Sequence, residues 1–338
     1  MSRVSFSRRE TLAASLGAVV LAACGPKKPS VEPSRGPALL LGSASALVSA
    51  ANVVWAFELK PRAIFSRAEL IPAVSKLISE ENFTAFSKRH GGIDLRQIEE
   101  LVVARYPKTD FSLAKVRFEP ARVEASFTER VLGVEGRAID PANPEIVRLW
   151  GDAHGERTQV AMFGREMVAL ETGQFAPVRV AELFAQGRLK KSLPISHAEP
   201  FARVRELLGQ TDARIISPGP FEGEWQKALG GLLRATAAVG VGVRVREESS
   251  RAFLDTRMVL LGSWGEDTEA EARLVSGLNV ILSTGFAKLI NLGSPVASPK
   301  VTRRDDALVV DASWDALRLA DGLHTAVDAS VSEIFQRI

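Results

Sequence analysis

The sequence predicts an α+β fold with short, largely antiparallel sheets and packed amphipathic helices. Runs with strand periodicity follow one another with only turn residues between them, which favours antiparallel neighbours. Apolar residues at helical spacing recur between these groups of strands. Hydrophobic residues make up 46% and charged residues 25% of the 338 positions, and the two kinds are mixed throughout, as is typical of globular proteins.

In the first half, a β-rich run that ends at Lys60-Pro61 predicts a strand over Val53–Leu59. Apolar residues at helical spacing from Leu70 to Ile78 predict a helix, and Pro72 indicates that it begins late. Pro120 opens a helix whose apolar face carries Val123, Phe127 and Val131. The other predicted strands are Ile98–Tyr106 and a meander of Glu145–Trp150, Thr158–Phe163 and Glu166–Glu171.

The second half repeats this style. Predicted helices cover Val180–Lys190 and Glu199–Leu208. Two more are predicted from apolar residues at helical spacing, one from Leu274 to Leu282 and one that carries Trp225, Leu229, Leu232, Leu233 and Thr236. Strict alternation predicts strands at Val239–Val245, Phe253–Leu261 and Leu308–Trp314. Thr268 and Glu271 have the spacing of a capping box, and Asp315 is expected to cap a final helix. In this pattern Trp225 is expected to be a core residue.

These elements divide the body at a boundary around Gly173 to Pro177. The expected organisation is a signal peptide at 1–23, a lipidated cysteine with a Pro-rich tether at 24–37, and two α+β halves at 38–175 and 176–338. Both halves follow a strand–helix–strand plan, which favours a diverged duplication. The alternative is a single continuous domain.

The first residues are typical of a targeting segment. Arg3, Arg8 and Arg9 precede an apolar stretch from Leu12 to Ala23, which is shorter than the roughly 20 residues that span a bilayer. The stretch ends in Leu21-Ala22-Ala23-Cys24, which resembles the lipobox of bacterial lipoproteins. The resemblance implies that Cys24 receives diacylglycerol and becomes the mature N-terminus. The alternative is a buried apolar cysteine in an N-terminal helix.

The residues around Arg8 and Arg9 also resemble a twin-arginine export signal. Thr11 and Ala13 depart from that motif, so general secretion stays open as the route. After Cys24, prolines at high density favour an extended tether. Gly25 is not the aspartate that retains lipoproteins at the inner membrane, which favours the outer membrane. The body resembles only uncharacterised envelope lipoproteins, through a pattern of a strand followed by Gly-Ile-Asp-Leu at Gly92 to Leu95.

Known catalytic motifs do not assemble in this sequence. Ser112 and Lys115 spell S-x-x-K, but the two partner motifs of penicillin-binding proteins do not occur. A single cysteine excludes an internal disulfide, and the four histidines have no ligand spacing, so we expect no metal and no cofactor. The arginines of the leader account for most of the net charge of +3, so we expect no nucleic-acid partner.

One irregular stretch stands out before the predicted helix of Trp225. Its candidate binding residues are Pro218, Gly219, Pro220, Phe221, Glu222 and Glu224. The two carboxylates favour the first turn of a helix, so one interpretation is a rigid helix entry. The other is a surface loop that binds a partner.

Two functions therefore stay open. The favoured one is a non-enzymatic envelope lipoprotein, attached to the membrane through Cys24, that binds another envelope component or a small ligand. The alternative is a periplasm-facing hydrolase whose site forms only in three dimensions, from Glu222, Glu224 and either His154 or His197. A deep pocket that gathers these groups would favour the hydrolase.

Overall fold

The computed structural model describes residues 38–336 apart from Leu132, His154, 174–175, Lys190, Glu266 and Asp305, and without the side chains of Val134 and 328–336. The predictions for Arg8, Arg9, Cys24, the tether and His154 lie outside the described residues. The described chain from residue 38 onward belongs to one compact unit. Within it, no helix combines the length and the apolar character needed to cross a bilayer.

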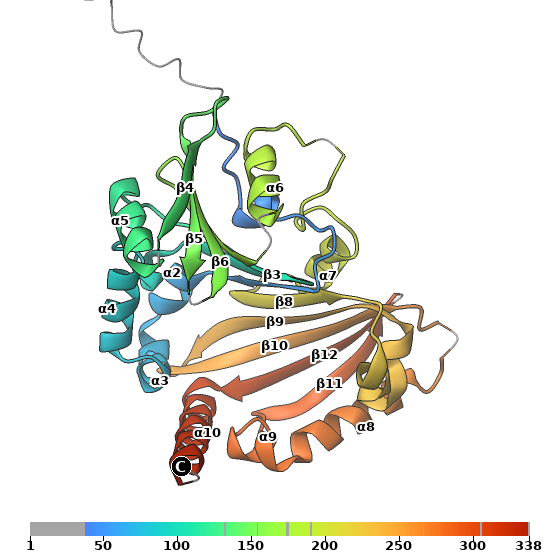
Figure 1. Cartoon of the computed structure of the whole chain (residues 1–338). Coiled ribbons are helices and arrows are strands. Elements are labelled where there is room, and N and C mark those ends of the chain that lie inside the picture. Colours follow the sequence, from blue (N-terminus) through green and yellow to red (C-terminus); the bar gives the residue numbers. More distant parts are fainter. Residues whose placement is uncertain are drawn as a thin grey trace, which may run out of the picture. The chain divides into compact units, whose positions relative to one another are not determined.

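The body is built on a single antiparallel sheet, which confirms the predicted α+β class (Figure 1). Its strands run in the order β11-β12-β10-β9-β8-β1-β2-β3-β7-β6-β5-β4. Their bounds are β1 Trp55–Leu59, β2 Glu100–Tyr106, β3 Thr109–Lys115, β4 Val134–Ile139, β5 Ile146–Ala153, β6 Glu156–Phe163, β7 Met167–Gly173, β8 Ala213–Pro218, β9 Thr236–Glu248, β10 Arg251–Gly262, β11 Ala297–Arg304 and β12 Ala307–Asp315. The two sequence halves join in this sheet, because β8 pairs with β1.

Helices cover both faces of the sheet. They are η1 Ala44–Leu47, α2 Pro61–Phe65, η2 Ala68–Leu70, α3 Ile71–Leu77, α4 Glu80–Arg89, η3 Leu95–Gln97, α5 Pro120–Arg130, α6 Ala176–Ala185, α7 Phe201–Leu208, η4 Gly223–Ala235, α8 Ala270–Ser283, α9 Gly285–Leu289 and α10 Ala316–Gln336. Figure 1 shows α4 and α5 on one side of β5 and β6, with α6 on the other side.

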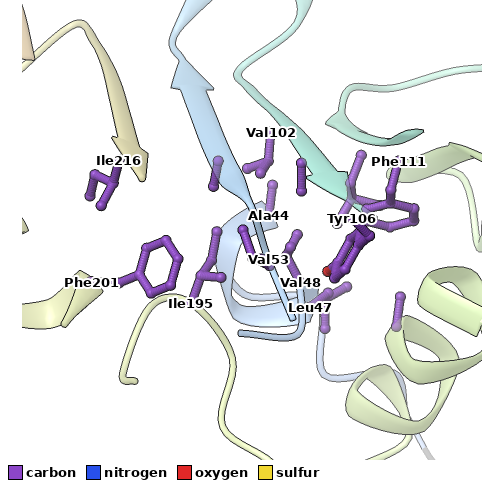
Figure 2. Close-up of a cluster of buried hydrophobic side chains, with 14 of the residues drawn as sticks. Ala44, Leu47, Val48, Val53, Val102, Tyr106, Phe111, Ile195, Phe201 and Ile216 are labelled. Atoms are coloured by element: carbon purple, nitrogen blue, oxygen red, sulfur yellow. The ribbon is translucent and has the colours of Figure 1, made fainter. Parts of the chain in front are cut away.

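The largest core lies on the face covered by η1, α6 and α7. Figure 2 shows this cluster, with Leu47 and Val48 beside Tyr106 and with Phe201 beside Ile195. Tyr106 donates a hydrogen bond to the carbonyl oxygen of Ser49 at 2.8 Å, which satisfies its buried hydroxyl. This face is therefore closed by packing.

The opposite face is covered in two separate places. At one end of the sheet, the α5 residues Val123 and Phe127 pack on Val160 and Met162 of β6. Toward the other end, η4 and α8 pack on β10 and β12, and α3 and α10 form a further cluster with β9 and β10. Between these patches, Phe57 is half-buried and Ile215 is 40% exposed. The two residues are register partners on β1 and β8, so they share this face.

Strand β9 explains why glycines interrupt its valines. The sequence favours a wet face at Gly240 and Gly242, but both glycines are buried. A Cβ on Gly240 would lie 2.2 Å from Cγ1 of Val204 in α7. At these two positions the face is therefore packed against α7, whereas Arg244, farther along the same face, is exposed.

Two helix ends test the capping predictions. Asp315 accepts a hydrogen bond from the backbone N–H of Arg318 at 3.0 Å, so its role as the cap of α10 is confirmed. The capping box of Thr268 and Glu271 is wrong. Helix α8 begins at Ala270 after Glu269, whose side chain makes no cap bond, and Asp267 accepts from the N–H of Glu269 instead.

Candidate functional site

The Pro218–Trp225 loop does not place its aromatic residues as the sequence pattern predicts. Trp225 is 69% exposed, so its expected place in the core is wrong. The predicted helix is broken, because Ala228 has ψ 153 and Leu229, Gly230 and Gly231 have positive φ. The continuous helical stripe therefore does not exist. Leu232 and Leu233 are buried in the core, Phe221 and Leu229 pack against them, and Thr236 is buried where β9 begins.

The rest of this loop is framed by close backbone contacts. Gly219 lies where a Cβ would come within 2.9 Å of the carbonyl oxygen of Thr236, and the Gly219–Pro220 peptide bond is cis. Glu222 and Glu224 face water, and Glu224 pairs with Lys227 at 2.8 Å. The loop therefore presents an exposed indole beside two solvated carboxylates.

The residues suspected of hydrolysis are not gathered by the described structure. His197 is exposed and shares a hydrogen bond of 2.8 Å with its neighbour Ser196. Neither His197 nor the two loop carboxylates line the pocket or the groove described below. Among the described residues, no three His, Cys, Asp or Glu side chains gather as metal ligands would.

The S-x-x-K string lies on a strand. Ser112 and Lys115 belong to β3, where an odd spacing places two side chains on opposite faces of the sheet. Lys115 donates to the carbonyl oxygen of Gly42 at 3.0 Å. Lys115 therefore cannot take the proton of Ser112, and the motif is a chance occurrence.

An apolar space lies between α4, α5 and the sheet, and we call it the α4–α5 pocket. Its volume is about 240 Å³. The strands supply its floor, which consists of Leu101, Val103, Ser112, Ala114, Val160, Val168, Ala169 and Leu170. The helices and the segment between α4 and β2 supply its walls, which consist of Phe86, His90, Ile93, Ile98, Val123 and Arg130.

Local sequence rules explain this cavity. On β2, β3 and β7, alternate residues point to opposite faces, so Val103, Ser112 and Leu170 face the pocket while their neighbours face the closed core. Pro120 starts α5, and Gly91 with φ +67 and Gly92 with φ +88 turn the chain sharply after α4. A Cβ on Gly91 would lie 2.6 Å from Cα of Val123, so the glycine lets α4 end against α5.

The polar side chains in the lining are His90, Ser112 and Arg130. The ring of His90 lies 4.3 Å from the ring of Phe86, centroid to centroid. Burial, together with the charges of Arg130 and Arg89, lowers the pKa of His90 to about 4. His90 is therefore uncharged at neutral pH, and the positive charge at this place belongs to the two arginines.

Arg130 is half-buried and lacks an acidic partner among the described residues. Its Nε donates to the carbonyl oxygen of Ser126 at 3.2 Å, and no described carboxylate forms an ion pair with it. Burial and the nearby charge of Arg89 lower the pKa of Arg130 from its ordinary value. A guanidinium nevertheless stays protonated in proteins, so a cation without a counter-ion lines an apolar pocket.

A second hollow, a groove of about 640 Å³, lies at the end of α7 over β9, β10 and β12. Its charges are largely neutralised within the protein. Asp311 accepts from Arg257 at 2.7 Å, and Asp255 accepts from Arg246 at 2.9 Å. Arg244 and Lys300 also line the groove, whose walls are more polar than those of the α4–α5 pocket.

No motif in the sequence could identify the pocket residues as a group. They come from six helices and strands and from the segment between α4 and β2, and most of them are ordinary apolar residues. From the sequence, His90 is expected at a solvent-exposed helix end beside Gly91, but it is half-buried and lines the pocket. A signal was nevertheless present, because the basic residues Arg89 and Arg130 end two consecutive amphipathic helices.

The comparisons with known proteins leave the family open. No protein-family model and no curated protein matches the chain. Among solved structures, the chain is similar to the one titled "Structure of crystal form IV of TP0453", at 10% sequence identity, with a TM-score of 0.47 over 84% of this chain and 96% of that chain. A score of that size does not establish a shared fold, so the function is argued from the chain's own residues.

Proposed function

We propose that this chain is a lipid-anchored protein of the bacterial cell envelope whose body binds a small apolar ligand without chemically changing it. The observation that carries the binding role is the α4–α5 pocket. A dry apolar cavity of about 150 Å³ is already large enough to bind benzene, and this pocket measures about 240 Å³. Its apolar lining with few polar groups is typical of ligand sites.

The side chains of the pocket support binding more than catalysis. Ser112 is its one hydroxyl group, and no described imidazole or carboxylate accepts a hydrogen bond from it. Acyl transfer needs a nucleophile with a base in hydrogen-bond reach. The described lining therefore lacks the pair of groups with which hydrolysis would begin.

The anchor is supported by the residues around Cys24. A diacylglycerol and an amide-linked chain on this cysteine would bury enough methylene groups, at ~0.8 kcal/mol each, for stable attachment to a membrane. The protein would face the periplasm, and Gly25 favours the outer membrane. We expect intact-mass spectrometry of the mature protein to find a triacylated N-terminal Cys24, and an unmodified N-terminus would contradict the anchor.

The binding role is tested with a neutral fluorescent probe, N-phenyl-1-naphthylamine. The full chain with Cys24→Ser is used, so that no attached lipid competes. We expect saturable fluorescence enhancement that Ser112→Phe abolishes, because the phenyl ring fills the pocket from its floor. The matched control is Ser276→Phe, at an exposed serine of α8 outside the pocket. Equal probe binding by the two variants would refute the pocket as the site.

The exposed Trp225 favours a second candidate function, the docking of an envelope protein on the Pro218–Trp225 loop. Exposed tryptophans are frequent anchors of protein interfaces. This function predicts that Trp225→Ala reduces crosslinking of one defined envelope protein and leaves probe binding unchanged. Identical crosslinking patterns before and after the substitution would exclude it.

A further inference from the structure

The α4–α5 pocket combines apolar walls with an uncompensated positive charge. Arg130 lines the pocket, and Arg89 is close enough to shift the pKa values of both His90 and Arg130. Neither arginine forms an ion pair with a described carboxylate. Arg89 is exposed, but Arg130 is half-buried, and other half-buried arginines of the body, such as Arg148 and Arg205, do have acidic partners. A half-buried cation without a partner is costly, and an anion bound beside it would offset that cost.

The pocket is also the end of a longer apolar strip. Val103 on its floor is the register partner of Phe57, and Phe57 is the register partner of Ile215. Side chains at paired positions share one face of the sheet, so the three residues form a continuous row. Phe57 is half-buried and Ile215 is 40% exposed, so a chain that fills the pocket can continue over this row toward solvent.

The volume limits the number of chains that fit. If about 150 Å³ accommodates the six carbons of benzene, then about 240 Å³ accommodates a single alkyl segment of about nine or ten carbons. Two parallel acyl chains do not fit this space. The ligand is therefore a molecule with one chain.

We infer that the α4–α5 pocket binds a single-chain anionic amphiphile, a free fatty carboxylate, with its chain between α5 and the sheet and its head group on Arg130. A guanidinium can donate two parallel hydrogen bonds to a carboxylate, which gives the head group an orientation. His90, which is uncharged at neutral pH, can donate one further hydrogen bond. This inference rests on the proposed function, because it names the ligand class of the same pocket.

The experiment compares three probes of equal chain length on the full chain with Cys24→Ser. They are decanoate, 1-decanol and decyltrimethylammonium, and their affinities are measured by isothermal titration calorimetry at neutral pH. We expect decanoate to bind at least tenfold more tightly than decanol, since a hydrogen bond to a charged group contributes about 1.5–3 kcal/mol and each 1.4 kcal/mol is a factor of ten. We expect the cationic probe to bind most weakly.

Arg130→Met separates the charge from the cavity. The variant keeps the length and apolar stem of the side chain, so decanol affinity should stay unchanged, while decanoate affinity should fall about tenfold, to that of decanol. Arg122→Met is the matched control. It lies in the same helix, it pairs with Glu119 at 2.8 Å, and it does not line the pocket. It should leave the affinities of all three probes unchanged.

The outcomes separate this inference from the proposed function. Equal affinities for decanoate and decanol, or an unchanged decanoate affinity in Arg130→Met, would overturn the anionic ligand and leave an apolar pocket in place. Failure of both decanoate and decanol to bind would overturn both. Competition by inorganic phosphate alone at decanoate's affinity would show a site for simple anions and would also overturn the inference. Decanoate binding that survives Ser112→Phe would place the ligand elsewhere and overturn it.

Discussion

A buried carboxyl group on the closed face of the sheet should make the stability of this protein fall as the pH rises. Glu171 of β7 is fully buried under α6, and its Oε2 accepts a hydrogen bond from the backbone N–H of Val178 at 2.8 Å. Its other carboxyl oxygen has no partner among the described residues, and neither does the side-chain amide of Gln159, its register partner on β6. Burial raises the pKa of Glu171 to about 8, against the opposing effect of the N–H donors of α6.

The direction and the size of the change in the free energy of unfolding follow from proton linkage. Below an unfolded-state pKa of 4.5, Glu171 is protonated in both states and the stability is complete. Between 4.5 and about 8, the unfolded chain releases the proton and the folded chain keeps it, so the free energy of unfolding falls. At about 1.36 kcal/mol per pH unit, the total loss is at most about 5 kcal/mol.

The test compares wild type with Glu171→Gln by urea denaturation of the full chain at about pH 5 and about pH 8.5. The amide cannot ionise, and its oxygen can still accept from Val178. We expect the two proteins to differ little at the lower pH, and the variant to be more stable by several kcal/mol at the higher pH. The control is Glu156→Gln, at an exposed position of β6. The stability of this variant should depend on pH as that of wild type does. An identical pH dependence in wild type and Glu171→Gln would refute the burial argument.

Two further substitutions test the packing. Trp225→Ala should change the free energy of unfolding by less than about 1 kcal/mol, because the side chain is 69% exposed, and a melting temperature lowered as by a core deletion would contradict this. Gly240→Ala should lower the free energy of unfolding by about 1–3 kcal/mol, because the new Cβ would lie 2.2 Å from Cγ1 of Val204. The control is Gly42→Ala, whose Cβ would meet nothing within 4 Å and which should leave the stability in urea denaturation unchanged.

Local patterns in the sequence predicted most elements but not their partners. The alternation in β9 and β10, the start of α5 at Pro120 and the cap at Asp315 are all set by neighbours within one element. The pairing of β8 with β1 depends on residues more than 150 positions apart, such as Phe57 and Ile215, and no local pattern encodes it. The sheet order was therefore beyond the sequence argument.

The break in η4 shows where periodicity misleads. Trp225, Leu229 and Leu232 fit a helical stripe, but Leu229 adopts φ 52 and the chain turns there. The turn packs against α8, where a Cβ on Gly277 would lie 2.8 Å from Cα of Leu229. Leu229 therefore has a positive φ, which leucine rarely adopts, at the point where its backbone contacts α8. The Gly230-Gly231 pair was the signal in the sequence that favoured a turn.

The two functional features of the body lie on opposite faces of the same strand, and this makes their tests independent. Leu170 of β7 lines the α4–α5 pocket, while its neighbour Glu171 points under α6. A strand sends consecutive side chains to opposite faces, so Glu171→Gln alters the closed core without touching the pocket. Decanoate should therefore bind Glu171→Gln as it binds wild type at a pH where both are folded. A change in affinity would mean that the protonation of Glu171 reaches the pocket through β7, and the two faces could then no longer be treated as separate.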